Sequence, residues 1–289
     1  MNNFDIKGAE ETITWMSQRK YYRIKQNGIN VIFCNYPNDL VAMKNAFIFW
    51  TYKLKENNIN VPLIIWNYDN GLLIQDLWDN TLDKYFNNII FKKHQIICKQ
   101  VFEAVEKIHN IQITHNKKLT KTGKMNINFF LKSASELLDC QWYCKLWLQR
   151  EWMAKYLSYA NDLIDIESIN YTYWISDFQS RNIIIKDNIP YLIDYQDIRY
   201  LTPELDFWAF ISDSYVDYSK DELLQILYLI NNKKYNYHKI IGWGIIKLFH
   251  AIRLYLLQVY NKNNSAYITP LENWIKRIYN LEKLLYLNI

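Results

Sequence analysis

The stretch that decides the fold covers residues 174–197 and reads WISDFQSRNIIIKDNIPYLIDYQD. Two short apolar runs, 183–186 and 191–193, flank Asp187 and Asn188, and both of these residue types favour tight turns. The pattern predicts a β-hairpin. Asp177 and Asn182 precede its first strand and Asp194 follows its second, so pairing of the two strands would bring these three side chains together.

Two carboxylates and an amide oxygen at one point suit a hard cation such as Mg²⁺, which keeps several waters and binds substrate phosphates. The order D-x-x-x-x-N, hairpin, D is typical of the phosphoryl-transfer site of the protein-kinase fold. We therefore expect Asp177 to accept the proton of an attacking hydroxyl, and Asn182 and Asp194 to hold the metal. The simpler alternative is a surface hairpin with solvated acidic ends.

Length and composition set the class of protein. The chain has 289 residues, of which 50% are hydrophobic, enough for one two-lobed unit or two domains. The net charge of +5 comes from scattered Lys and Arg, which argues against a nucleic-acid partner. Four cysteines favour free thiols in a reducing compartment, and Cys140 and Cys144 would lie on one helix face without forming a zinc site.

The first residues lack the basic start and apolar core of a signal peptide, and no uninterrupted apolar run is long enough for a bilayer. We expect a cytoplasmic protein with no membrane partner. The sequence does not indicate its oligomeric state.

The first quarter of the chain predicts a small sheet with one helix. Strands are expected at 21–24, 30–34, 61–66 and 72–75, with a hairpin turn at Asn27-Gly28. Residues 9–16 predict a short helix or an entry loop. Apolar residues recur at helical spacing over 39–56, where Asp39 is a candidate cap.

The rest of the chain predicts helices, at 81–86, 94–109, 134–159, after residue 206 and towards the end. Together these elements indicate an α+β protein with a protein-kinase-like two-lobed fold. The expected N-lobe is 1–78, and the expected helical C-lobe, 79–289, carries the catalytic loop and the metal-binding hairpin. A ligand cleft between the lobes is the default site.

The strings D-F-Q-S-R-N at 177–182 and I-D-Y-Q-D at 193–197 resemble the aminoglycoside phosphotransferase and choline kinase superfamily. Within it they are most similar to bacterial anomeric sugar kinases, and segments 17–24, 71–77 and 250–254 agree with that. The resemblance implies transfer of the γ-phosphate of ATP, with Mg²⁺, to the anomeric hydroxyl of N-acetylmuramate or N-acetylglucosamine, a step of cell-wall recycling. The partner would be a small molecule with a hydroxyl group.

The resemblance also implies roles for further residues. Asp206 falls where the superfamily has an Asp that steadies the catalytic loop. Residues that belong to the subgroup's motifs and would serve the substrate or the loop are Gln179, Arg181, Gln196 and Asp197. For Arg181 we weigh a phosphate or acidic substrate against fixing the loop through Asp197. Candidate nucleotide-binding residues are Ser17, Arg19 and Lys20 near the first hairpin, and Gln75 and Leu77 in the hinge.

Three positions depart from the superfamily's pattern. Ile175 stands where a His usually precedes the catalytic Asp, strand 30–34 has no Lys for the phosphates, and Trp78 would narrow the nucleotide pocket. Lys25 and Arg23 are candidates to replace that Lys. These departures keep a pseudokinase binding module as one alternative.

A kinase for aminoglycosides or choline is the other alternative, and it would need a cage for a cation. The residues that would form the cage are Glu204, Asp206, Asp213 and Asp217 with Trp208 and Tyr215. Ordinary helix packing is the interpretation we favour for them.

Overall fold

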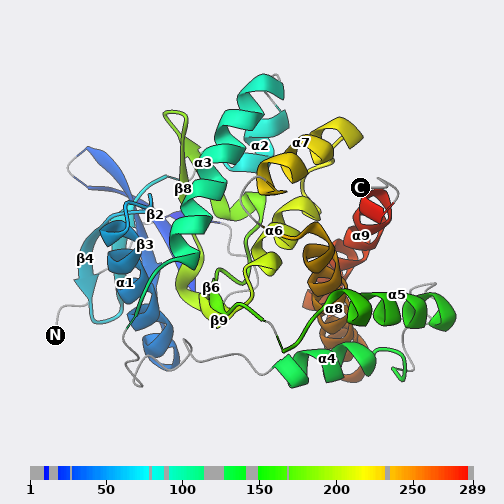
Figure 1. Ribbon diagram of the computed structural model, residues 1–289. Helices are drawn as coiled ribbons and strands as arrows, with labels where there is room; N and C mark the ends of the chain where they lie inside the picture. The colour runs from blue at the N-terminus through cyan, green and yellow to red at the C-terminus, as the bar shows by residue number, and fades with distance from the viewer. Residues whose placement is uncertain are drawn as a thin grey trace.

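The computed structural model describes residues 10–12, 19–26, 28–77, 80–87, 91–113, 127–140, 149–167, 169–231 and 235–285. Figure 1 shows a sheet with one helix on one side of the molecule and a larger helical part on the other.

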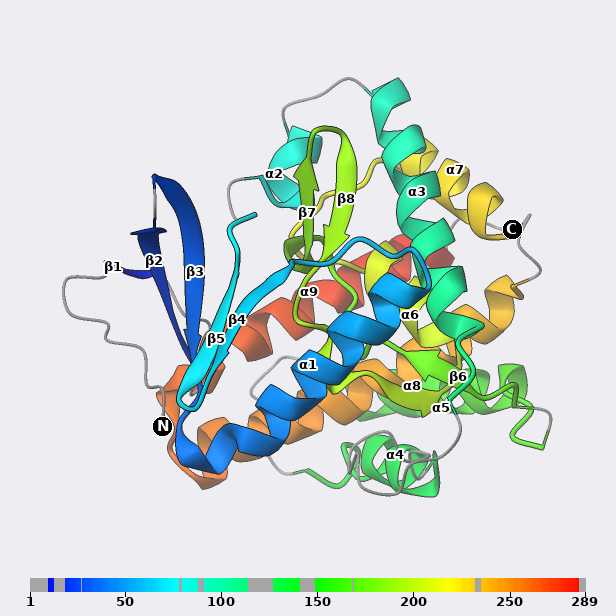
Figure 2. The same cartoon turned by 90° about the vertical axis from the view of Figure 1, so that its left-hand side faces the viewer.

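The N-lobe is a five-stranded antiparallel sheet of order β1-β2-β3-β5-β4 (Figure 2). Its strands are β1 (Glu10–Thr12), β2 (Lys20–Gln26), β3 (Ile29–Asn35), β4 (Ile64–Tyr68) and β5 (Gly71–Gln75). After β3 the chain makes a 3₁₀ turn, Asn38–Leu40, and then the long helix α1 (Val41–Glu56). The predicted pairing of 21–24 with 30–34 is confirmed, since Tyr21 lies opposite Cys34 and Ile24 opposite Val31.

Three local predictions for this lobe were wrong. Residues 10–12 form an edge strand against β2, where a helix or loop was expected. The strand expected at 61–66 begins only at Ile64, because Pro62 has no N–H to donate to a ladder. Asp39 lies within the 3₁₀ turn and its side chain caps neither that turn nor α1. Asn27 of the predicted turn lies outside the described residues.

The helices of the C-lobe are α2 (Leu82–Asn87), α3 (Phe91–His109), α4 (Ile127–Ser135), α5 (Arg150–Leu163), α6 (Glu204–Ile211), α7 (Lys220–Asn231), α8 (Tyr237–Leu256) and α9 (Ile268–Leu285). Two strand pairs complete it. β6 (Thr172–Trp174) pairs with β9 (Arg199–Leu201), and β7 (Ile183–Lys186) pairs with β8 (Ile189–Leu192).

The single helical stretch expected over 134–159 is divided. α4 ends at Ser135 and turns follow over 136–139, so Cys140 is not in a helix, while Cys144 is outside the described residues. Apolar residues continue at helical spacing through the turn, since Leu137 is buried and Leu138 half-buried. Spacing alone therefore gave no sign of the break.

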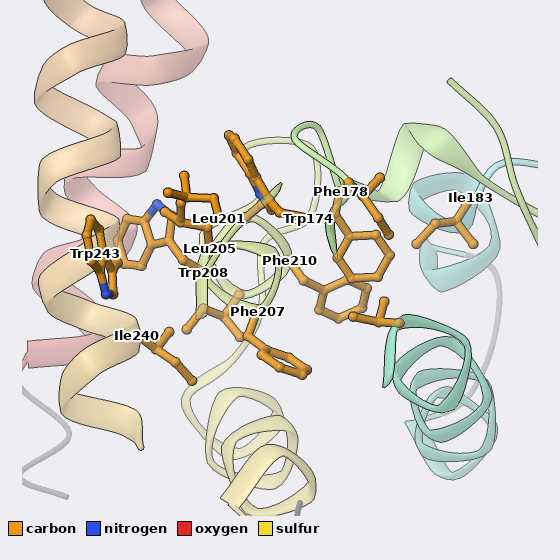
Figure 3. Close-up of a cluster of buried hydrophobic side chains, with 14 of the residues drawn as sticks. Trp174, Phe178, Ile183, Leu201, Leu205, Phe207, Trp208, Phe210, Ile240 and Trp243 are labelled. Carbon is orange, nitrogen blue, oxygen red and sulfur yellow. The ribbon is translucent and has the colours of Figure 1, made fainter. Parts of the chain in front are cut away.

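The core of the C-lobe forms where α8 crosses α6 (Figure 3). Trp208 of α6 is fully buried, and a Cβ at Gly244 of α8 would lie 2.1 Å from its ring. Only glycine permits this close approach of the two helices. Among the described residues one segment, 237–261, is long and apolar enough to cross a membrane, and 78% of its apolar window is buried inside the protein.

Helix α1 also holds the two lobes together. Phe47 of α1 stacks on Tyr195 with ring centroids 4.9 Å apart, and the hydroxyls of Thr51 and Tyr195 lie 2.7 Å apart. Tyr195 directly follows Asp194, so the end of the predicted metal-binding hairpin is fixed against the N-lobe.

Candidate active site

The β7–β8 hairpin has the geometry that its sequence predicts. Asp187 and Asn188 both have positive φ, 53° and 60°, as the two central residues of a type I′ turn do. Beyond the strands, Ile193 N donates to Asn182 O across 2.9 Å, and Asn182 Nδ2 donates to Asp177 O across 2.8 Å. These bonds bring Asp177, Asn182 and the segment that carries Asp194 together.

Two residues of this site have left-handed backbone conformations although neither is glycine. Ser176 has a φ of 72° and Asp194 a φ of 58°. Such conformations cost free energy and persist where the surrounding contacts hold them, often at functional sites. One lies directly before Asp177 and the other is itself a predicted metal ligand.

The Asp177 carboxylate is solvent-accessible but surrounded by charged groups of the protein. Desolvation raises its pKa, and Asp194 and Asp213 raise it further, while Lys247 and Arg277 lower it. Gln179 Nε2 donates to Asp177 Oδ2 across 3.1 Å, and Arg277 Nη2 donates to Gln179 Oε1 across 3.2 Å. Gln179 thus links the carboxylate to a buried arginine of α9.

Asp206 holds the loop before Asp177 through a backbone N–H group. Its carboxylate accepts from Ile175 N across 3.1 Å and lies 3.0 Å from His109 Nε2. A second acid on the same side, Asp213, accepts from Ser180 N across 2.5 Å. The loop from 175 to 180 is therefore held through its backbone N–H groups by two buried carboxylates.

Asp194 pairs with a side chain from the other lobe. Arg19 Nη2 donates to Asp194 Oδ1 across 2.8 Å, and Gln196 Nε2 donates to the same oxygen across 2.8 Å. Arg19 is only 6% exposed. Gln196 Oε1 is buried and has no hydrogen-bond partner among the described residues.

This donor set fits a divalent cation accompanied by phosphate and water. Asn182 and Asp194 supply hard oxygen ligands, and the buried oxygen of Gln196 would accept from a metal-bound water. In the described part of the chain, no three His, Cys, Asp or Glu residues gather as a metal site. Mg²⁺ needs few protein ligands, since it takes most of its ligands from phosphate and water.

The predicted nucleotide-binding residues are less closely grouped than Asp177, Asn182 and Asp194. Lys20 Nζ lies 3.4 Å from Glu11 Oε2 in an exposed pair, whereas Arg19 faces Asp194. Gln75 N donates to Leu63 O, so this N–H is not available to an adenine, and the neighbouring candidate is the buried Leu77. Ser17 and Trp78 lie outside the described residues.

Of the two cations considered as replacements for a strand lysine, Lys25 is exposed on β2 and Arg23 has another partner. Arg23 forms an ion pair with Asp76, with Nε and Oδ2 2.7 Å apart. Lys44, on α1, donates to the carbonyl oxygens of Tyr68 and Asp69. Arg19 is therefore the cation that the structure places beside Asp194.

Arg181 has contacts that fit a role in fixing the loop. Its guanidinium lies 3.6 Å from the centroid of the Tyr215 ring, and its Nε lies 3.6 Å from Asp83 Oδ2. These contacts join the loop to α2 and to the segment after α6. The predicted partner Asp197 lies in the 3₁₀ turn Tyr195–Asp197, and the pairing of the two residues stays a prediction.

Solved structures with the same arrangement of lobes include aminoglycoside 2′-phosphotransferase-IIIa in complex with GDP. It has a TM-score of 0.68 and 15% identity, with 99% of this chain and 95% of that chain covered. The chain has a protein-kinase-like fold. An ethanolamine kinase from Plasmodium vivax has a TM-score of 0.63 and 14% identity, with 96% of this chain and 83% of that chain covered.

A choline kinase from Streptococcus pneumoniae gives a TM-score of 0.63 and 12% identity, covering 95% of this chain and 93% of that one. The expected α+β, two-lobed fold class is thereby confirmed. No family model and no curated protein matches the sequence.

Sequence reasoning missed three residues of the site, Asp213, Lys247 and Arg277. Asp213 had been named only as part of a cation cage, and the other two lie on α8 and α9, 71 and 98 positions from the loop residues that they contact. Arg277 gave no signal, because an arginine in an amphipathic helix usually faces solvent. Lys247 did give one, since it is the only Asp, Glu, Lys or Arg in the apolar run 240–252.

Proposed function

We propose that this chain is an ATP-dependent small-molecule kinase that phosphorylates the anomeric hydroxyl of N-acetylmuramate or N-acetylglucosamine. The observation that carries the proposal is the convergence of Asp177, Asn182 and Asp194 around the β7–β8 hairpin, within a protein-kinase-like fold. The structural neighbours supply the class of reaction, since their names describe aminoglycoside, choline and ethanolamine kinases. The D-F-Q-S-R-N string supplies the choice of sugar. A cytoplasmic location is part of the proposal.

In this proposal Asp177 orients the acceptor hydroxyl and takes its proton. An anomeric hydroxyl is more acidic than an ordinary alcohol, so a carboxylate is an adequate base. Asn182 and Asp194 hold Mg²⁺, which offsets the negative charge of the nucleotide phosphates when it is bound. Arg19, beside Asp194, binds the same phosphates and takes the place of the missing strand lysine.

The acidic residues after β9 argue against a cationic acceptor, because each has a structural partner. Asp206 holds Ile175 N, Asp213 holds Ser180 N, and Asp217 pairs with Lys283 across 2.7 Å. Glu204 accepts from Thr202, and Trp208 is fully buried in the core. These partners support ordinary helix packing over a cation cage for the acidic residues.

The charges around Asp177 do not separate the acceptor classes. Lys247 and Arg277 favour a neutral or anionic acceptor, whereas Asp194 and Asp213 favour a cationic one. The choice of an N-acetylated sugar therefore rests on the D-F-Q-S-R-N string.

The test is nucleoside diphosphate release with Mg²⁺ and either ATP or GTP on four acceptors, N-acetylmuramate, N-acetylglucosamine, choline and kanamycin. We expect turnover on an N-acetylated sugar. Turnover on choline or kanamycin alone would instead indicate a kinase for choline or aminoglycosides. A folded protein that binds Mg-ADP but turns over none of the four would indicate a pseudokinase.

A further inference from the structure

Lys247 is a buried cation that contacts the loop before Asp177, and sequence analysis did not identify it as a site residue. It lies in the middle of α8 and is only 7% exposed. Its Nζ donates to Ser176 O across 2.7 Å, and Ser176 is the left-handed residue directly before Asp177. The ammonium also lies 4.8 Å from the centroid of the Trp174 ring and 5.9 Å from that of Trp274.

A lysine in this position is costly to the fold. Burial lowers its pKa to about 8, and Arg277 lowers it as well, although Asp177 and Asp206 oppose the shift. A methionine would fill similar space in α8 without a charge to desolvate. A buried charge that donates to the loop before Asp177 is a candidate for a role in the site.

The backbone of the loop shows what that role is. Asp206 and Asp213 hold its N–H groups at Ile175 and Ser180, and Asn182 holds the carbonyl of Asp177. The carbonyl of Ser176 is held by Lys247. Position 175 carries an isoleucine, so the loop has no polar side chain of its own there to fix this turn.

We propose that Lys247 is a positioning residue, which holds the Ser176 carbonyl and thereby keeps the strained turn that aims Asp177 at the acceptor. The proposal rests on the proposed kinase function for its catalytic consequence, and on the Lys247–Ser176 contact alone for its structural one. In this proposal Lys247 acts through the loop and not through contact with the acceptor or the nucleotide.

Two variants and a control test this. In Lys247→Met the contact is lost, and Lys247→Arg keeps a donor and a charge. Lys239→Met, on the same helix two turns away from Lys247, is the control. Thermal unfolding of each variant first establishes that it is folded.

The structural arm is hydrogen exchange of the backbone amides in 175–182. In Lys247→Met we expect these amides to exchange at least about fivefold faster, as loss of one charged hydrogen bond would cause. Lys239→Met should leave them unchanged. Unchanged exchange in Lys247→Met would overturn the proposal, whether or not the protein has kinase activity.

The kinetic arm compares kcat, KM and the Kd for Mg-ADP. We expect Lys247→Met to lower kcat by about ten- to a hundredfold, as misplacement of a reacting group does, with the Kd for Mg-ADP within about twofold. Lys247→Arg should recover part of the loss. A normal kcat in Lys247→Met, or an equal loss in Lys239→Met, contradicts the proposal, whereas absence of turnover in the parent protein contradicts the kinase function instead.

Discussion

Arg19 of the N-lobe donates to Oδ1 of Asp194 in the C-lobe across 2.8 Å, although 175 positions separate the two residues. The ion pair places a buried guanidinium at the proposed metal ligand. A cation there can serve both the carboxylate and the phosphates, and bidentate guanidinium donors match phosphate oxygens well.

Arg19→Gln is therefore expected to weaken Mg-ADP binding by about tenfold or more, since it removes a charge-assisted hydrogen bond. Titration calorimetry with Mg-ADP measures the effect. Lys53→Gln is the matched control, because Lys53 is another N-lobe cation, on α1, and pairs with Glu56 at the exposed surface. Equal affinities in Arg19→Gln and the parent protein would exclude a phosphate contact.

Asp194 and Asn182 are expected to make nucleotide binding depend on Mg²⁺. In the parent protein the affinity for ADP should rise when Mg²⁺ is added, and in Asp194→Ala that rise should disappear because a ligand of the cation is missing. Asn182→Ala should reduce the rise in ADP affinity on addition of Mg²⁺ without removing it. Asp187→Asn, at the exposed tip of the same hairpin, should behave as the parent does, and an unaltered Mg²⁺ dependence in Asp194→Ala would rule out the proposed metal site.

Gln179 should act on catalysis and not on nucleotide binding, because it connects the Asp177 carboxylate to Arg277. Gln179→Leu removes both hydrogen bonds while keeping similar volume. We expect kcat to fall roughly tenfold, since a catalytic group loses its orientation, with the Kd for Mg-ADP unchanged. A parallel loss of nucleotide affinity would show that the side chain supports the whole cleft.

His250 provides a pH-dependent contribution to stability away from the catalytic loop. It stacks on Phe130 with ring centroids 4.2 Å apart. Burial, with the charges of Arg253 and Lys247, lowers its pKa from 6.5 to about 4. The folded state then binds the proton less readily than the unfolded state, so stability should be fully present above pH 6.5 and fall as the pH drops towards 4.

Protonation of His250 is expected to lower the free energy of unfolding by up to about 3 kcal/mol, given about 1.4 kcal/mol per pKa unit. Chemical denaturation of the parent protein and of His250→Gln at pH 7 and pH 4.5 measures it. The pH dependence should be smaller in His250→Gln, and the same dependence in both proteins would show that other groups cause it.

The sequence predicts the fold well where local chemistry determines structure. Asp187 and Asn188 favour a turn by their own side chains, and the apolar runs beside them pair as expected. The N-lobe hairpin follows from the same kind of pattern, with Gly28 at a φ of 81°. These features depend on neighbours in sequence, so one sequence is enough to find them.

The parts that sequence reasoning missed depend on contacts between distant segments. Lys247 reaches Ser176 across 71 positions and Arg277 reaches Gln179 across 98. No local pattern distinguishes Arg277 from an ordinary helix-surface residue. Lys247 stands out as the lone Asp, Glu, Lys or Arg in the apolar run 240–252, but its partner in the loop cannot be found from local sequence. The same reason explains the strand at 10–12, whose pairing with β2 gives it a structure that its composition does not predict.

The most direct test of the central claim compares the parent protein with Asp177→Asn at saturating N-acetylmuramate and Mg-ATP. Phosphorus NMR identifies the product and the initial rate of ADP release gives the turnover. We predict the sugar 1-phosphate from the parent protein, and a rate lower by about a thousandfold in Asp177→Asn with Mg-ADP binding retained, as loss of a general base would give. Equal rates in the two proteins, or phosphate on another hydroxyl, would contradict the proposed role of Asp177 at an anomeric hydroxyl.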